Sequence, residues 1–344
     1  SRDINLETKI EAYENLTVDN SSDRYEYIFP SYKFSKRLPS NFNGNYEIIS
    51  SGNYKNYDTN IFEKVLINDL KFSSNPKIKP SGFVNKFSLL LKNITSEADN
   101  SSNYKNKFSS ENYGSFFYDM SYPLKKNGKF FDNFFTAKGS LMYSPNANKD
   151  LKKLDRKIDI NNIFTQNRLS LDDSVEGGRS LTLGGEYILK GNDSGKDIIK
   201  AGLATVLRDE EEINLPTKST LNNKGSDFIG SILFEPNNNL KFDYNFSVDS
   251  DFESSNYNLL KTDISVNKFV TSFEFLQEDD EVGSESYLTN ETAYNFSDAY
   301  SLRYRTRRNE KTDFTEFYNL IYEYKNDCLT ASIQYNKDYY SDNE

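Results

Sequence analysis

The chain has 344 residues and a formal net charge of −10, with 36% hydrophobic and 15% aromatic residues. No run approaches the roughly 18 apolar residues of a membrane-spanning helix, which excludes a helical membrane protein, and the high aromatic content excludes a disordered chain. The sequence has no histidine and one cysteine, which excludes histidine-based acid–base catalysis, cysteine-cluster zinc sites and internal disulfides, while the net acidity argues against a nucleic-acid partner.

In chain order, alternation of apolar and polar residues first predicts seven strands in the N-terminal part. A β-strand points successive side chains to opposite faces, so a period of two separates an apolar face from a polar one. The segments reach or exceed the ~9–11 residues that a tilted strand needs to cross a bilayer, and the longer ones are expected to extend past the outer surface. The predicted strands lie near residues 4–14, 24–35, 43–54, 59–72, 82–92, 112–124 and 130–144.

The middle of the chain predicts two more strands between connectors of different length. Pro145–Gly178 and Asp209–Lys224 are long and polar, whereas Lys190–Asp197 is short. The same rhythm of short and long connectors continues to the end of the chain.

From Asp227 onward the alternation is clearest. Leu240–Asp249 places five apolar residues on one face and charged or amide residues on the other. A sandwich core gives the same alternation, but repeated strands with two classes of connector favour a transmembrane β-barrel with short periplasmic turns and long extracellular loops. Eight strands are predicted here: Asp227–Glu235, Leu240–Ser250, Asn256–Val266, Lys268–Gln277, Ser286–Phe296, Ala299–Arg308, Asp313–Tyr324 and Cys328–Tyr340.

The sequence therefore predicts an all-β fold, an antiparallel transmembrane β-barrel of the outer membrane with about seventeen strands. Bacterial single-chain barrels have even strand numbers, so we expect this barrel to be incomplete. The chain opens on SRDINLETKI, with no initiator methionine and no signal-cleavage pattern, which also suggests a segment of a longer protein.

Three arginines share one face of the strand Ala299–Arg308, namely Arg303, Arg305 and Arg307. One interpretation is a basic strip in the barrel lumen that meets anionic lipid headgroups. The alternative is a set of lumen salt bridges to acids such as Glu316 on the next strand.

Cys328 is predicted at the periplasmic end of its strand. A lone cysteine in an oxidising compartment suggests an intermolecular or long-range disulfide. The alternative is a small buried filler residue.

The least generic stretch is NRLSLDDSVEGGRSLTLGGEY, residues 167–187. Paired glycines permit tight turns and close packing. The charged residues predict an ion-pair network that anchors the loop, although an ordinary surface loop is the alternative. These residues are Arg168, Asp172, Asp173, Glu176 and Arg179.

This stretch resembles the NRFSGxDRxEGG segment of the LptD family, the lipopolysaccharide-assembly proteins. The segments RYEYIFPSYKFSK, KGSLMYSPN and YNLIYEYKNDCLTASIQYNKDYYSD are also similar to that family. Leu169, Leu171 and Ser174 depart from the motif. The matching motif positions are Asn167, Arg168, Ser170, Asp173, Glu176, Gly177 and Gly178.

The resemblance implies a barrel of about 26 strands with an N-terminal periplasmic jelly-roll. Residues 1–344 would form part of the barrel, without the jelly-roll, the first strands and the last strand. Such a protein assembles lipopolysaccharide into the outer leaflet of a Gram-negative outer membrane, through its lumen and a lateral gate. It is not an enzyme and needs no cofactor or metal.

The resemblance also implies partners. They are lipopolysaccharide, outer-membrane lipid, an LptE-like lipoprotein that plugs the lumen, and an LptA-like periplasmic bridge that reaches the jelly-roll. Cys328 matches the cysteine that pairs with a cysteine of the periplasmic domain. A general outer-membrane porin and an extracellular β-rich adhesin remain alternatives.

Overall fold

A computed structural model describes residues 4–15, 25–40, 43–57 and 60–339. The fold is all-β and antiparallel, of the β-barrel type, and 18 strands belong to one sheet. Among these residues the one helical segment is the short 3₁₀ turn η1 (Thr217–Ser219). No described helix is long and apolar enough to cross a membrane. The chain divides into two compact units, which are described separately.

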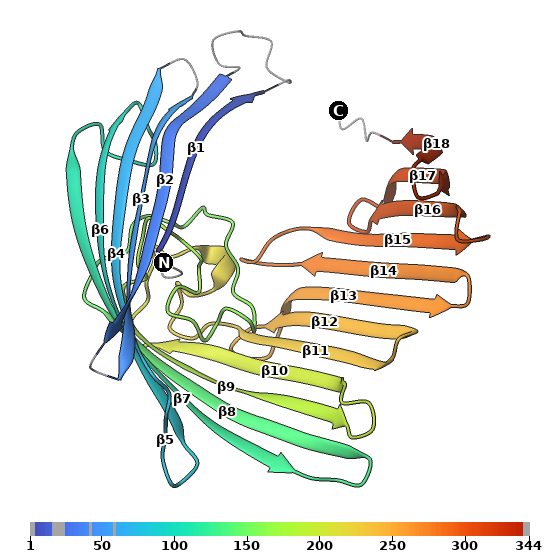
Figure 1. Ribbon diagram of the computed structural model, residues 1–344, viewed down its shortest axis with the longest axis horizontal. Helices are drawn as coiled ribbons and strands as arrows, with labels where there is room; N and C mark the ends of the chain where they lie inside the picture. Colours follow the sequence, from blue (N-terminus) through green and yellow to red (C-terminus); the bar gives the residue numbers. More distant parts are fainter. Residues whose placement is uncertain (1–3, 16–24, 41–42, 58–59, 340–344) are drawn as a thin grey trace. The chain divides into compact units, whose positions relative to one another are not determined.

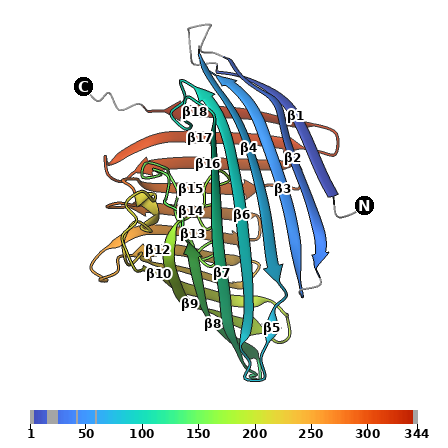
Figure 2. The ribbon, with the colours of Figure 1, turned by 90° about the vertical axis from the view of Figure 1, so that its left-hand side faces the viewer.

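The first unit contains residues 1–120, 140–150 and 165–181. Its first strands pair antiparallel in chain order, β1 with β2, β2 with β3, β3 with β4 and β4 with β6, while the two-residue β5 pairs with the start of β6 (Figure 2). The strands are β1 (Ile4–Glu14), β2 (Tyr25–Ser40), β3 (Gly44–Tyr57), β4 (Ile61–Ser74), β5 (Lys77–Ile78) and β6 (Val84–Asp99).

Three long strands run through both units: β7 (Ser109–Lys126), β8 (Phe131–Ser144) and β9 (Gly178–Gly191). The second unit continues with β10 to β18, in which each strand pairs antiparallel with the next (Figure 1). These strands are β10 (Asp197–Arg208), β11 (Phe228–Asn237), β12 (Leu240–Val248), β13 (Ser255–Val266), β14 (Phe269–Glu278), β15 (Ser286–Asn295), β16 (Tyr300–Asn309), β17 (Phe314–Lys325) and β18 (Thr330–Asp338).

The predicted all-β antiparallel fold is confirmed. Seventeen of the described strands have nine residues or more, which agrees with the predicted number. The eighteenth, β5, was not predicted, because a strand of two residues is too short to show an alternation of apolar and polar residues. Strand ends were less accurate: β6 continues to Asp99, beyond the predicted end at residue 92. In this extension small or apolar residues, such as Ile94 and Ala98, are buried while Glu97 is exposed. The apolar residues of the extension therefore lie on the opposite face of the strand from those of its first part, and this change hides the alternation in the sequence.

The two faces of the sheet differ in the second unit. On β12, Asn245 and Ser247 line a cavity of about 290 Å³ together with residues of the segment 157–161. By the alternation of a strand the side chains of Tyr244 and Phe246 point to the opposite face, and their ring centroids are 5.2 Å apart. We call the side covered by connecting segments the loop-bearing face and the other the apolar face. Exposed side chains on the apolar face include Ile232, Phe273, Leu320 and Tyr322.

Candidate functional site

The motif stretch forms an ordered segment of the first unit, which we call the motif loop (residues 165–177). The Asn167 side chain holds a tight turn, since its Nδ2 donates to the Leu171 carbonyl at 2.9 Å and its Oδ1 accepts from the Leu171 N–H at 3.1 Å. Ser170 lies inside this turn with a positive φ of 52°. Leu169 and Leu171, which depart from the family motif, are both buried. Leu171 in place of the motif's glycine therefore adds apolar contact beneath the turn, whereas Leu169 replaces one apolar side chain, phenylalanine, by another.

Arg168 and Glu176 form a buried ion pair that closes the motif loop. The Arg168 Nε donates to Glu176 Oε2 at 2.8 Å, and Nη2 contacts the other carboxylate oxygen. Nη2 also donates to Ser180 Oγ at 2.8 Å, on β9. The side chains are 2% and 4% exposed. A fork-to-fork arrangement of this kind fixes both position and orientation.

Asp173 attaches the motif loop to the β6–β7 connection and to the first part of its own β8–β9 connection. Its carboxylate accepts from the Tyr104 hydroxyl at 3.1 Å, and Lys149 Nζ donates to its carbonyl at 2.7 Å. Burial raises the pKa of Tyr104 well above its usual range, and the charge of Asp173 raises it further. The phenol therefore stays protonated at physiological pH and remains a donor to Asp173.

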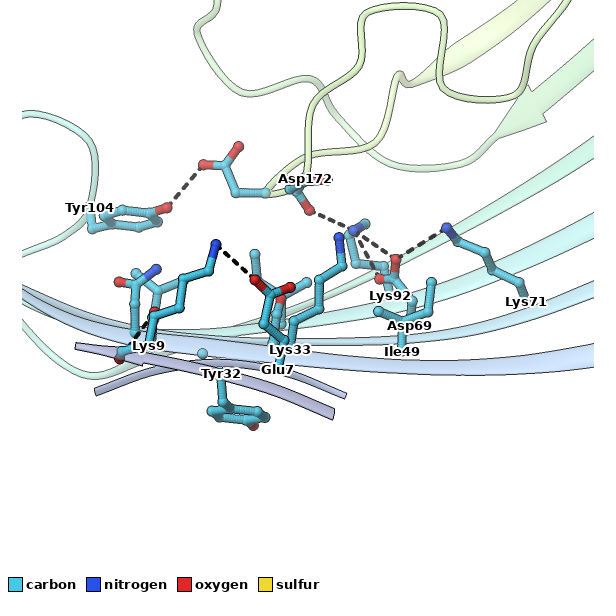
Figure 3. Close-up of a pocket in the computed structure, with 17 residues that line it drawn as sticks. Glu7, Lys9, Tyr32, Lys33, Ile49, Asp69, Lys71, Lys92, Tyr104 and Asp172 are labelled. Atoms are coloured by element: carbon cyan, nitrogen blue, oxygen red, sulfur yellow. Dashed lines mark hydrogen bonds and ion pairs between the residues drawn. The ribbon is translucent and has the colours of Figure 1, made fainter. Parts of the chain in front are cut away.

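Lys92 connects the motif loop to strands β4 and β6 of the sheet. It lies directly opposite Asp69 in the β4–β6 register, with Nζ 2.9 Å from Asp69 Oδ1. The same ammonium group donates to the Asp172 carbonyl at 2.6 Å (Figure 3). Sequence reasoning missed this pair, because the partners are 23 residues apart and meet only through the register.

Two glycines lie where the motif loop joins β9, at positions that a larger residue would not fit. A Cβ on Gly177 would lie 2.1 Å from the Asn146 carbonyl oxygen, and the Gly177 N–H donates to Asn148 Oδ1 at 2.8 Å. Gly178 has a φ of 84° and begins β9. The seven motif residues thus contribute turns, a buried ion pair and close backbone packing.

The arginine strip on β16 is engaged in salt bridges. Arg303 and Arg305 both contact Glu291 on β15, at 3.3 and 3.0 Å. Arg307 lies 3.1 Å from Glu316 on β17. The pairing agrees with the salt-bridge interpretation, whereas contact with anionic headgroups stays a prediction.

A β-bulge explains how Glu316 reaches Arg307. Arg307 pairs with Phe317 and Arg308 pairs with Thr315, so Glu316 is the extra residue of β17. The bulge turns its side chain toward the arginines. Simple alternation would have placed Glu316 with Tyr318 on the apolar face.

Cys328 is exposed and free, in the turn between β17 and β18. The prediction that its strand begins at Cys328 was wrong, because β18 begins at Thr330. The Asn326 side chain accepts from the Cys328 and Leu329 N–H groups at 3.0 and 2.7 Å, which forms a turn instead of a strand. The predicted disulfide remains a prediction.

A single-sheet antiparallel fold with an apolar face on one side and loops on the polar side is typical of bacterial outer-membrane β-barrel proteins. The chain matches the family model LptD, described as LPS transport system D, over residues 1–269. The chain therefore belongs to the LptD family. No curated protein matches it.

The family assignment bears on several predictions. LptD is a lipopolysaccharide-transport family of the outer membrane and not an enzyme family, which favours transport over the porin and adhesin alternatives. The matched region includes the motif loop. Cys328 and the arginine strip lie beyond it, so their proposed roles rest on the sequence resemblance and on local geometry.

Proposed function

We propose that this chain forms part of the wall of a translocon that assembles lipopolysaccharide into the outer leaflet. The transport is non-enzymatic: the saccharide part of the lipid passes along the loop-bearing face, which lines the lumen, and the lipid leaves through a lateral gate. The family assignment and the segregation of polar and apolar faces support this function.

The proposal includes the rest of the machine. A complete barrel of about 26 strands would draw its other strands, and a periplasmic jelly-roll, from outside these 344 residues. An LptA-like bridge would deliver the lipid to the jelly-roll, and an LptE-like lipoprotein would plug the lumen. The arginine strip on β16 would meet anionic groups of lipid.

The observation that carries the proposal is the two-sided wall, and neighbouring residues of β11 test it. Ser231 lines a cavity on the loop-bearing face, whereas Ile232 is exposed on the apolar face. A photo-crosslinking amino acid at position 231 of the full-length protein should capture lipopolysaccharide in living cells. Capture at 231 should depend on continued lipopolysaccharide supply, whereas position 232 should capture mainly bulk phospholipid. Equal capture at both positions would contradict transport along the loop-bearing face.

The exposed turn that holds Cys328 makes a second prediction. Cys328→Ser in the full-length protein should abolish a disulfide to the periplasmic domain and slow assembly, because the turn can no longer be tethered. Non-reducing gels should show a change in mobility. Ser332→Ala, on the adjoining strand, is the control for disturbance near the turn. Unchanged mobility of the Cys328 variant would reject the disulfide.

A further inference from the structure

The connection between β4 and β6 forms an ordered hairpin, which we call the β5 hairpin (residues 75–83), and it extends beyond the end of β4 (Figure 2). Its tip is a β-turn: the Gly82 N–H donates to the Lys79 carbonyl at 2.9 Å, and the Lys79 N–H donates to the Phe83 carbonyl at 2.8 Å. Pro80 occupies the second position of this turn, where proline is favoured. The side chains of the hairpin are therefore held in defined positions.

On the apolar face, the side chains change in character toward the β5 hairpin. Exposed leucines come first, among which Leu70 of β4 lies opposite Leu91 of β6. An aromatic group follows, in which the ring of Phe72 lies 4.9 Å from that of Tyr46 and 5.6 Å from that of Phe87. Outer-membrane barrels have the same order, an apolar band that ends at an aromatic girdle where the membrane meets water. The hairpin is therefore expected to begin at the membrane surface.

The charge of this region is opposite to that of the whole chain. The chain has a net charge of −10, yet residues 70–96 contain five lysines and neither aspartate nor glutamate. Two of these lysines approach Asp69 on the loop-bearing face. The other three are exposed and make no ion pair with any residue that the structure describes, namely Lys77, Lys79 and Lys86. The hairpin therefore presents positive charge that no carboxylate of the described residues balances.

The lysines lie next to apolar side chains, and this combination suits a lipid surface. Lys77 pairs with Asn85, two residues before Phe87, so the alternation of the strand places it on the face of the aromatic group. Phe83, at the tip, is 44% exposed. Apolar groups can enter the boundary of the hydrocarbon while lysine stems lie along it and carry the ammonium groups to the headgroups. An acidic protein surface would match the lysines but would not explain their continuity with the apolar band.

The position of the β5 hairpin along the strands selects the leaflet. Neighbouring strands run in opposite directions, so the hairpin lies at the other end of the strands from the β6–β7 and β8–β9 connections. The end that carries the longest connections is extracellular in outer-membrane barrels. The hairpin therefore faces the periplasmic leaflet, opposite the leaflet into which lipopolysaccharide would be assembled.

We propose that the β5 hairpin binds the headgroups of anionic phospholipids in the periplasmic leaflet, with the ammonium groups of Lys77 and Lys79 at lipid phosphates and Phe83 at the boundary of the hydrocarbon. This inference rests on the proposed function, which places these strands in the wall of an outer-membrane translocon. It goes further by naming a second lipid class, a site for it and the residues on which the selectivity of that site depends.

The test is photo-crosslinking of the full-length protein in vesicles made of equal amounts of phosphatidylglycerol, which is anionic, and phosphatidylethanolamine, which is not. A photo-crosslinking amino acid replaces Ser81, which is exposed at the tip of the hairpin. Phosphatidylglycerol should be captured in more than about tenfold excess at low salt, because each lysine near an anionic surface contributes roughly a fivefold preference. The combined change Lys77→Gln and Lys79→Gln should bring the ratio close to one, and so should high salt.

Two control variants separate charge at the hairpin from charge elsewhere. Lys77→Arg combined with Lys79→Arg keeps both charges and should retain the excess of phosphatidylglycerol. Lys107→Gln removes an exposed lysine from the β6–β7 connection, at the other end of the strands in the same unit. It should leave the ratio of the two captured lipids unchanged.

Equal capture of the two phospholipids by the protein with both lysines, or an unchanged ratio in the double glutamine variant, would overturn the inference. Capture of a protein in place of phospholipid at position 81 in living cells would do the same. None of these results touches the proposed transport function if position 231 still captures lipopolysaccharide. Loss of capture at position 231 with intact lipid selectivity at position 81 would reject the transport path and leave the phospholipid site.

Discussion

Arg168→Met in the full-length protein is expected to release the motif loop and raise its cleavage by protease about 100-fold or more. Methionine fills much of the space of the arginine but leaves the Glu176 carboxylate buried without its bidentate partner. Breaking a buried ion pair by removing one member costs about 3–5 kcal/mol. Protease cleaves the segment only while it is transiently open, so the cleavage rate depends on the free energy of opening. Losing the ion pair lowers that free energy and therefore raises the cleavage rate.

Two further variants isolate the pair. Arg168→Met combined with Glu176→Leu should recover most of the protection, since apolar residues of similar volume often replace a buried pair without loss. Arg37→Met is the control, because that side chain is 77% exposed and lies 3.6 Å from Glu47, where a surface pair contributes at most about 1 kcal/mol. Cleavage of Arg168→Met at the unmodified rate would contradict a structural role for this pair.

The anchored loop explains a change in the hydrophobic pattern. A barrel strand is expected to be polar toward the lumen, yet Val65, Leu90, Ile94 and Phe117 are buried in β4, β6 and β7. The motif loop contributes buried Leu169, Leu171 and Val175 in the same unit. Part of the loop-bearing face is therefore a dry core, in which the Arg168–Glu176 pair is shielded from water.

Much of the fold could be predicted from the sequence because alternation is a local signal. Strand number and strand type follow from a period of two, and the strands from β11 onward were found by their connectors. Register is not local: the bulge at Glu316 and the pairing of Asp69 with Lys92 depend on how two strands align. For the same reason the polar cavity between β1–β4 and the motif loop had no sequence signal, since its lysines come from separate strands.

The motif loop was partly predictable. Clustered charges indicated an ion-pair network, and Arg168 does pair with Glu176. The partners of Asp173 lie at Tyr104 and Lys149, far along the chain, and no spacing rule connects them. Arg179, which was also assigned to the network, lies over the ring of Tyr143 with a 5.7 Å separation.

Lys92→Met is expected to produce the second largest loss, about 2 kcal/mol in the free energy of unfolding measured by urea titration of the full-length protein in micelles. Asp69 would lose the ammonium group 2.9 Å away, and the Asp172 carbonyl would lose its donor. The loss should be smaller than for Arg168, because Lys71 lies 3.7 Å from the Asp69 carboxylate and is half-exposed, so it can turn inward to compensate part of the charge.

A double-mutant cycle with Asp69→Asn separates the ion pair from the contact to the motif loop. If the ion pair dominates, Lys92→Met should cost much less in the Asp69→Asn background, giving a coupling of about 1–2 kcal/mol. Lys64→Met is the control, since Lys64 contacts Glu97 on the apolar face of the same two strands at 3.3 Å and both side chains are half-exposed. Equal costs for Lys92→Met and Lys64→Met would mean that burial of the Asp69–Lys92 pair does not stabilise the wall, and that the motif loop is held by its own ion pair and by Asp173.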